Sequence, residues 1–192
     1  MHRLIWIVLI AGVLAACGEK ENPALTESLL AAETFNWCDQ PLTFQPPPAD
    51  WRRDRHNQGG LRGVWFVHSK SVGERIYVSE YYKVGERNKH ERRAYTRTIG
   101  EFVDEMRFST KGWPLPADSF VVGDIYADSV AGVEAYSLDF TMNTPDTTLV
   151  GREYYFLKNG YAFEAAFLGL WENLPLFERV VATISFEPAD AK

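Results

Sequence analysis

Cysteine and histidine are scarce in this sequence of 192 residues, which contains two of the first and four of the second. No two histidines are four residues apart, and no group of cysteines and histidines has the spacing of a zinc site. The sequence also lacks a Gly-x-Ser-x-Gly frame and a glycine-rich loop that opens a helix, so neither a nucleophile elbow nor a phosphate loop is indicated. We therefore expect a protein that is not an enzyme and that needs no metal ion or other cofactor.

Long apolar runs are equally scarce, and the run at the start of the chain covers only residues 4–16. A helix that spans a membrane needs about 18 or more apolar residues. The run follows Met-His-Arg and ends in small residues, which is typical of a secretory signal peptide. The four residues 14–17, Leu-Ala-Ala-Cys, resemble the bacterial lipobox, in which the cysteine is lipidated and the signal is cut off in front of it.

This resemblance divides the chain into a lipoprotein signal peptide (1–16), a lipidated tether (17–22) and a single domain (23–192). Acyl chains on Cys17 would anchor the domain, because each buried methylene contributes about 0.8 kcal/mol and two or more chains hold stably. Gly18 favours the periplasmic face of the outer membrane, since an aspartate there tends to retain lipoproteins in the inner membrane. Cys38 is then left without a disulfide partner. The alternative is a secreted protein without lipid, in which a cysteine stands at the cut by chance.

Charge is unevenly distributed along the chain, whose formal net charge is −6. Residues 51–111 hold fourteen Lys or Arg and eight Asp or Glu, whereas both flanking segments are acidic. This segment could form a basic face for lipid-headgroup phosphates or an acidic protein, or a solvated face with local partners such as Asp54 and Glu91. An acidic, exported protein is not expected to bind nucleic acid. The candidate anionic-partner face consists of Arg52, Arg53, Arg55, Arg62, Lys89, Arg92 and Arg93.

Three helices are predicted from apolar residues that recur with a period of 3.6. The first covers residues 23–35, with Asn22 as its cap and a proline in its first turn. The second covers residues 89–108, and the third follows Asn173 and extends to Ile184. Residues 54–60 are polar and end in two glycines, which predicts a loop.

Strands are predicted where β-branched and aromatic residues gather or alternate with polar ones. Asn159 and Gly160 predict a tight turn between two of these strands. Asp139 and Glu153 could face each other as an acid pair, but in an alternating pattern we expect both on a solvated face. The predicted strands cover residues 63–69, 75–84, 119–126, 133–142, 148–157 and 161–168, the first two forming a hairpin.

The order of these elements indicates an α+β domain in which helices pack against a mainly antiparallel sheet. Three segments resemble the PsbP/Mog1-like domains, which include bacterial lipoproteins of the DcrB kind. They are the entry Phe-Gln-Pro-Pro-Pro-Ala-Asp-Trp at 44–51, the hairpin at 154–163 and the closing segment at 177–186. The resemblance implies an α/β/α sandwich. It implies no activity and transfers no site residue, because this fold serves unrelated roles.

Two classes of function follow from these observations. In the first, which we favour, a membrane-anchored envelope lipoprotein acts as a non-catalytic module that binds a protein partner or takes part in assembly. In the second, the protein carries a lipid or small molecule, or is an inconspicuous hydrolase, and uses an aromatic-lined cleft. A stoichiometric protein partner would indicate the first class, and bound lipid without a partner would indicate the second.

Overall fold

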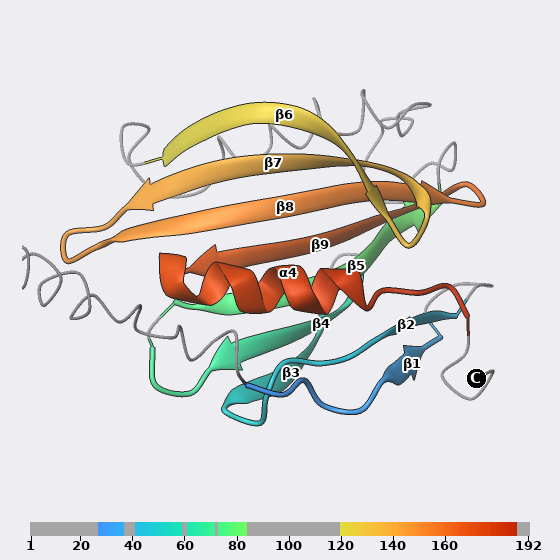
Figure 1. Ribbon diagram of the computed structural model, residues 1–192, viewed down its shortest axis with the longest axis horizontal. Helices are drawn as coiled ribbons and strands as arrows, with labels where there is room; N and C mark the ends of the chain where they lie inside the picture. The colour runs from blue at the N-terminus through green and yellow to red at the C-terminus, as the bar shows by residue number, and fades with distance from the viewer. Residues whose placement is uncertain (1–26, 37–40, 59–60, 72, 84–119, 188–192) are drawn as a thin grey trace, which may run out of the picture.

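The computed structural model describes residues 27–36, 41–58, 61–71, 73–83 and 120–187 (Figure 1). A small sheet is formed by β1 (Glu33–Phe35) and β2 (Leu42–Phe44). A large sheet is formed by β3 (Trp51–Gln58), β4 (Leu61–His68), β5 (Arg75–Lys83), β6 (Phe120–Val130), β7 (Val133–Asn143), β8 (Thr148–Lys158) and β9 (Tyr161–Gly169). The short 3-10 helix η3 (Trp171–Asn173) then leads into α4 (Leu174–Ala182).

The large sheet is antiparallel at every pairing, in the order β3-β4-β5-β9-β8-β7-β6. The strands β3, β4 and β5 pair in chain order, as do β6, β7, β8 and β9, and β9 returns to pair with β5. This last pairing joins the two halves of the sheet. Within the described chain, β3 and β6 are therefore its two edge strands.

The turn between β8 and β9 has the conformation that its sequence predicts. Asn159 and Gly160 both have positive φ, of 50° and 81°, and Lys158 pairs with Tyr161 across the turn. Positive φ at two successive central residues matches the right-handed twist of the flanking strands, and asparagine followed by glycine adopts it at low cost. The predicted hairpin is confirmed, as are the other strands predicted between residues 119 and 157.

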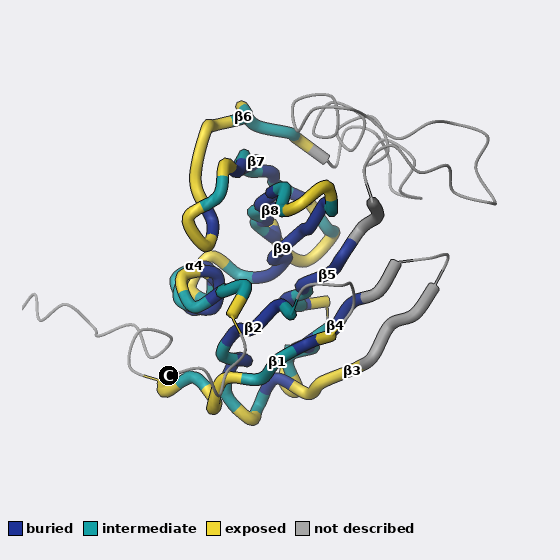
Figure 2. The backbone as a smooth tube through the Cα atoms, turned by 90° about the vertical axis from the view of Figure 1, so that its right-hand side faces the viewer, coloured by how far each residue is buried: buried dark blue, intermediate teal, exposed yellow. Residues whose placement is uncertain are grey.

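One face of the sheet, which we call the helix face, packs against α4 and the β1–β2 pair to form the main core (Figures 1 and 2). Alternation along β9 places Phe163 and Phe167 on this face, and both are almost fully buried. Phe177 of α4 stacks on Phe167 with ring centroids 5.8 Å apart. Phe35 stacks on Phe44 with centroids 4.8 Å apart. Figure 2 shows the sheet bending around α4, and the helix and the strands contribute side chains to one buried apolar cluster.

The helix α4 begins where the sequence predicts, after Asn173 and with a proline in its first turn. Asn173 makes no capping bond to the helix, and its side-chain nitrogen instead donates to Oε2 of Glu74 at 2.6 Å. The helix ends at Ala182, so Ile184, which was predicted to be helical, lies just beyond its end. Its side chain is nevertheless buried in the core, as the apolar periodicity requires.

The helix predicted at residues 23–35 is wrong over its described part, because residues 33–35 form β1. An isolated helix of this length is marginal, since nucleation is costly and short helices depend on packing. The strand conformation gives Phe35 its stacking partner Phe44 and places Oγ1 of Thr34 2.9 Å from Oγ1 of Thr43. Tertiary contacts therefore decide the conformation of this segment.

The loop predicted at residues 54–60 is also wrong, because β3 continues to Gln58 and pairs with β4 as far as Leu61. Polar side chains do not prevent strand formation at a sheet edge, where backbone hydrogen bonds to one neighbour supply the stabilisation. The neighbouring predicted hairpin of β4 and β5 is confirmed. The helix predicted at residues 89–108 lies outside the described residues.

A mainly antiparallel sheet with a helix packed against one face is an α+β fold, as predicted. No helix in the described ranges is long and apolar enough to cross a membrane.

Candidate functional site

A cleft of about 290 Å³ opens on the helix face, where β6, β7 and β8 meet η3 and the start of α4. Its lining is mostly apolar and includes Val121, Thr141, Val150, Trp171 and Leu174. The side chains of Trp171 and Val121 are 66% and 56% exposed. Exposed apolar side chains are common singly, but two that line one cleft mark a place where another molecule can bind.

The strand β6 has a bulge and a glycine where it borders this cleft. Its register against β7 shifts between Val122 and Ile125, which indicates a bulge. Gly123 lies within this stretch, and a Cβ atom there would stand only 2.8 Å from the backbone oxygen of Asp139. Glycine is therefore required for the close approach of the two strands, and its missing side chain leaves space above Asp139.

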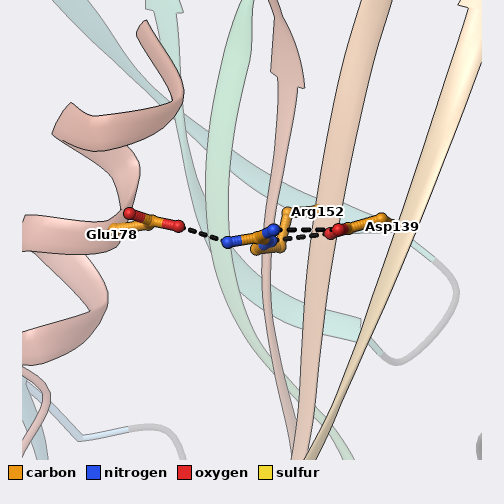
Figure 3. Close-up of polar contacts among 3 residues, drawn as sticks. All are labelled: Asp139, Arg152 and Glu178. Carbon is orange, nitrogen blue, oxygen red and sulfur yellow. Dashed lines mark hydrogen bonds and ion pairs between the residues drawn. The ribbon is translucent and has the colours of Figure 1, made fainter. Parts of the chain in front are cut away.

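Asp139 supplies a carboxylate to the cleft and belongs to a charged triad with Arg152 and Glu178 (Figure 3). Nε and Nη2 of Arg152 donate to Oδ1 and Oδ2 of Asp139 at 2.6 and 2.8 Å. Nη1 of the same arginine donates to Oε1 of Glu178. Asp139 and Arg152 are directly opposite on β7 and β8, whereas Glu178 comes from α4. The triad therefore ties the helix to the sheet.

The triad favours cations over anions. The hydrogen bonds that Arg152 donates to Asp139 are the main cause that raises the pKa of Arg152 above its ordinary value, so the guanidinium stays charged. Two carboxylates and one guanidinium leave a net charge of −1, and each carboxylate is 44% exposed. Both carboxylates are bound by the guanidinium of Arg152, and the triad is suited to orienting a ligand that carries positive charge.

A second polar group lies on the far face of the sheet and consists of two glutamates and two tyrosines. The hydroxyl of Tyr77 donates to Oε1 of Glu164 at 2.5 Å, and the hydroxyl of Tyr155 donates to Oε2 of Glu153. Glu164 lies opposite Tyr155, and Glu153 lies opposite Ala166, so the two glutamates are diagonal neighbours on β9 and β8. Both are buried, with 1% and 5% exposure.

Burial raises the pKa of Glu153 to about 7 and holds the pKa of Glu164 well above its ordinary value. The negative charge of Glu153 raises the pKa of Glu164 further, because two close carboxylates repel each other. Such pairs occur in acid–base sites. Neither glutamate lines the cleft, however, and each is bonded to its own tyrosine. We interpret this cluster as a structural one.

His68 occupies a half-buried position on β4. Its ring lies 5.0 Å from that of Trp51, and its Nε2 is 3.3 Å from Oδ2 of Asp50. The described ranges contain no group of three or more His, Cys, Asp or Glu residues that could hold a metal ion.

The structure describes only part of the predicted anionic-partner face. Arg52 and Arg53 are successive residues of β3 and therefore point to opposite faces of the sheet. Arg53 lies over the ring of Phe35, and its Nη1 is 2.5 Å from Oε2 of Glu33. The structure thus does not bring these two arginines together. The remaining predicted site residues are Cys17, Lys89, Arg92, Arg93 and the side chains of Arg55 and Arg62, which lie outside the described residues. The face and the lipidation site stay predictions.

Asp139 and Glu153 do not form the acid pair that was considered. Asp139 faces Arg152, whereas Glu153 faces Leu138 on the other side of the sheet. The expectation that Glu153 lies on a solvated face is wrong, because the residue is buried, with 5% exposure.

Sequence reasoning also missed the residues of the cleft and of the buried cluster. A signal existed for Glu164, which is a single acid within the apolar segment 161–170 and could have been expected to be buried. No comparable signal existed for Trp171, because a tryptophan between a strand and a helix is more often part of the core.

Comparisons with known proteins show where this fold occurs. No family model matches the sequence, and no curated protein matches it. Cyanobacterial PsbP (CyanoP) from Synechocystis superposes with a TM-score of 0.54 at 12% identity, over 83% of this chain and 95% of that chain. The chain has a PsbP-like fold. LpqN of Mycobacterium tuberculosis, which is involved in cell envelope biogenesis, superposes with a TM-score of 0.51 at 12% identity, over 86% of this chain and 95% of that chain.

A structure from Bacteroides thetaiotaomicron gives a TM-score of only 0.48 at 13% identity, over 76% of this chain and 45% of that chain. The chain therefore spans less than half of that protein. At 12% identity, the similarities to CyanoP and LpqN establish the PsbP-like fold and nothing about activity.

Proposed function

We propose that the chain is a lipid-anchored protein of the bacterial cell envelope that binds a partner through the cleft and catalyses no reaction. The observation that carries the proposal is the exposure of Trp171 and Val121 in the lining of one apolar cleft. Tryptophan is among the residues most enriched in the energetic centres of interfaces, because covering it removes a large apolar surface from water. The adjoining triad offers charge for orientation but no reactive group.

The sequence and the comparisons support the envelope part of this proposal. The lipobox-like residues 14–17 would hold the domain at a membrane, and Gly18 favours the periplasmic face of the outer membrane. LpqN, which shares the fold, is involved in cell envelope biogenesis. A binding module tethered in this way requires no catalytic motif.

Affinity capture of the full-length chain from membranes tests the proposal. Trp171→Ala removes exposed surface from the cleft, and Leu30→Ala is a matched control, because Leu30 is another exposed apolar residue. A stoichiometric protein partner should be recovered with the wild type and with Leu30→Ala, and recovery should fall at least about tenfold with Trp171→Ala. Equal recovery with all three proteins would contradict the proposal.

The size of the cleft favours a second candidate function, the carriage of a lipid or small molecule. Small-molecule sites usually measure about 300–1,000 Å³ and are mainly apolar, and this cleft lies at the lower limit. Native mass spectrometry that shows a bound lipid, together with the absence of a captured protein, would establish the carrier in place of the partner-binding module.

A further inference from the structure

The outer edge of β6 adjoins the cleft and carries two of the four exposed large apolar residues of the described chain. Only four large apolar residues in the described ranges are exposed, namely Leu30, Val121, Tyr126 and Trp171. Two of them lie on β6, and one of these, Val121, lines the cleft together with Trp171. No strand of the described chain pairs with β6 on the side away from β7. An eleven-residue edge strand with exposed apolar side chains is a template for a further strand.

The negative charge of this edge indicates what kind of strand could pair with it. β6 and β7 together contain four acids, Asp124, Asp128, Glu134 and Asp139, and neither strand contains Lys or Arg. The first three are exposed. Acidic side chains on an edge strand disfavour pairing with the same strand of a second copy, because like charges would then face each other. The same side chains favour an occupant that carries positive charge.

The register of β6 and β7 shows which side chains such an occupant would contact. On the helix face, Val121 is opposite Thr141, and Asp139 lies two residues before Thr141 on β7. An added strand about 4.8 Å beyond β6 would place an apolar side chain beside Val121. Two residues along, its next side chain on that face would lie beside Gly123, which has no side chain. A lysine or arginine at that position can extend over Gly123 towards the carboxylate of Asp139.

We propose that β6 and the cleft form a docking site for an extended, basic segment of a partner protein, which adds to the sheet as a further strand. This inference rests on the proposed function and names the chemistry of the partner. Main-chain hydrogen bonds to β6 supply affinity, and alternate side chains supply specificity. Apolar side chains of the segment cover Val121 and Tyr126 and enter the cleft beside Trp171, while its basic side chains face the acids of β6 and β7.

A peptide titration of the full-length chain in detergent tests the docking site. The probe is a short, end-blocked peptide that repeats Val-Thr-Lys-Thr, so that valine and lysine follow each other on one face of the added strand. Binding is followed by NMR of β6 amides and by tryptophan fluorescence. We expect saturable binding that is abolished by methylation of alternate peptide nitrogens, which removes the hydrogen bonds of strand addition. Replacing the lysines by glutamates should weaken binding at least about tenfold. Equal binding of either altered peptide would overturn the proposal.

Variants of the protein locate the site. Trp171→Ala should weaken peptide binding about tenfold and Asp128→Asn about threefold. Asp146→Asn, a matched change at an exposed position in the turn between β7 and β8, should leave binding unchanged. Equal effects of Asp128→Asn and Asp146→Asn would overturn the assignment to β6. Dimers of the free protein that Asp128→Asn strengthens, because it removes like charge from the paired edges, would show instead that a second copy occupies the edge.

The peptide experiment and the capture experiment fail in different ways. If no peptide binds but capture still depends on Trp171, the cleft binds a partner by another mode, and only strand addition is overturned. If capture does not depend on Trp171 either, the proposed function is overturned as well.

Discussion

Glu153 and Glu164 show how two carboxyl groups can be accommodated inside a sheet. Each is almost fully buried and accepts a hydrogen bond from a tyrosine hydroxyl. Burial without ionisation is far less costly than burial of a charge, which is why their pKa values rise. The positions could not be assigned from the sequence, because alternation on β8 is also compatible with a solvated glutamate, and burial depends on what covers the far face.

We predict that Glu153 makes stability depend on pH in the neutral range. Its pKa is raised from 4.5 to about 7 in the folded protein, so between these values the folded protein holds a proton that the unfolded chain has lost. The free energy of unfolding should therefore fall as pH rises from about 5 to 7, by about 1.4 kcal/mol for each unit of pKa difference. Urea unfolding at pH 5 and pH 8 measures this change.

Glu153→Gln should reduce this pH dependence, since glutamine accepts the bond from Tyr155 and does not titrate. The dependence that remains belongs to Glu164, and the double variant with Glu164→Gln should remove it. An unchanged difference between pH 5 and pH 8 in the double variant would contradict the prediction. Asp146→Asn is a suitable control, because Asp146 is exposed in a turn.

Arg152→Met tests the triad and should destabilise the protein by about 1–2 kcal/mol, because it leaves Asp139 and Glu178 without their shared donor. The expected loss of stability is modest because the side chains of both carboxylates are 44% exposed and solvent screens them. Arg53→Met removes a single pair to Glu33 on a more exposed arginine and should cost less. Urea midpoints of the two variants measure the difference, and a larger loss for Arg53→Met would contradict this view of the triad.

At the scale of elements, the sequence was informative where local and tertiary preferences agree. The Asn159–Gly160 turn and the start of α4 were predicted because their residues favour the observed backbone without help from the rest of the molecule. Residues 33–35 and 54–58 were assigned wrongly because both become strands through pairing with a neighbour. The cleft forms where η3 lies close to β6. The apolar periodicity of the sequence predicts single elements and does not predict how these two are placed relative to each other.

The contribution of α4 to the core gives a prediction at this scale. Phe177→Ala should cost about 3–5 kcal/mol, because the side chain is fully buried between Tyr154 and Phe167. Ala182→Ser at an exposed position of the same helix should change stability by less than about 0.5 kcal/mol. Thermal or urea unfolding measures both, and a loss below about 1 kcal/mol for Phe177→Ala would mean that α4 does not close the core as described.

At the scale of the whole molecule, the order of elements was enough to predict the fold class, whereas the comparisons at 12% identity add only that the fold recurs. A PsbP-like domain with an exposed cleft is compatible with many partners. The proposed anchor would reduce that number, because a domain held at one membrane surface would meet only molecules at that surface. The proposed envelope role therefore depends on the residue at position 17 more than on the fold.

Replacing that residue gives the decisive prediction at this scale. Cys17→Ser should abolish incorporation of labelled fatty acid and should release the protein from the membrane fraction, because the thiol that accepts the lipid is absent. Cys38→Ser is the matched control and should keep both the label and the membrane location. Labelling that persists in Cys17→Ser and disappears in Cys38→Ser would show that the lipid is attached to Cys38, within the domain. Labelling of neither protein would leave the cleft and the β6 edge as a binding surface but would remove the membrane that restricts its partners.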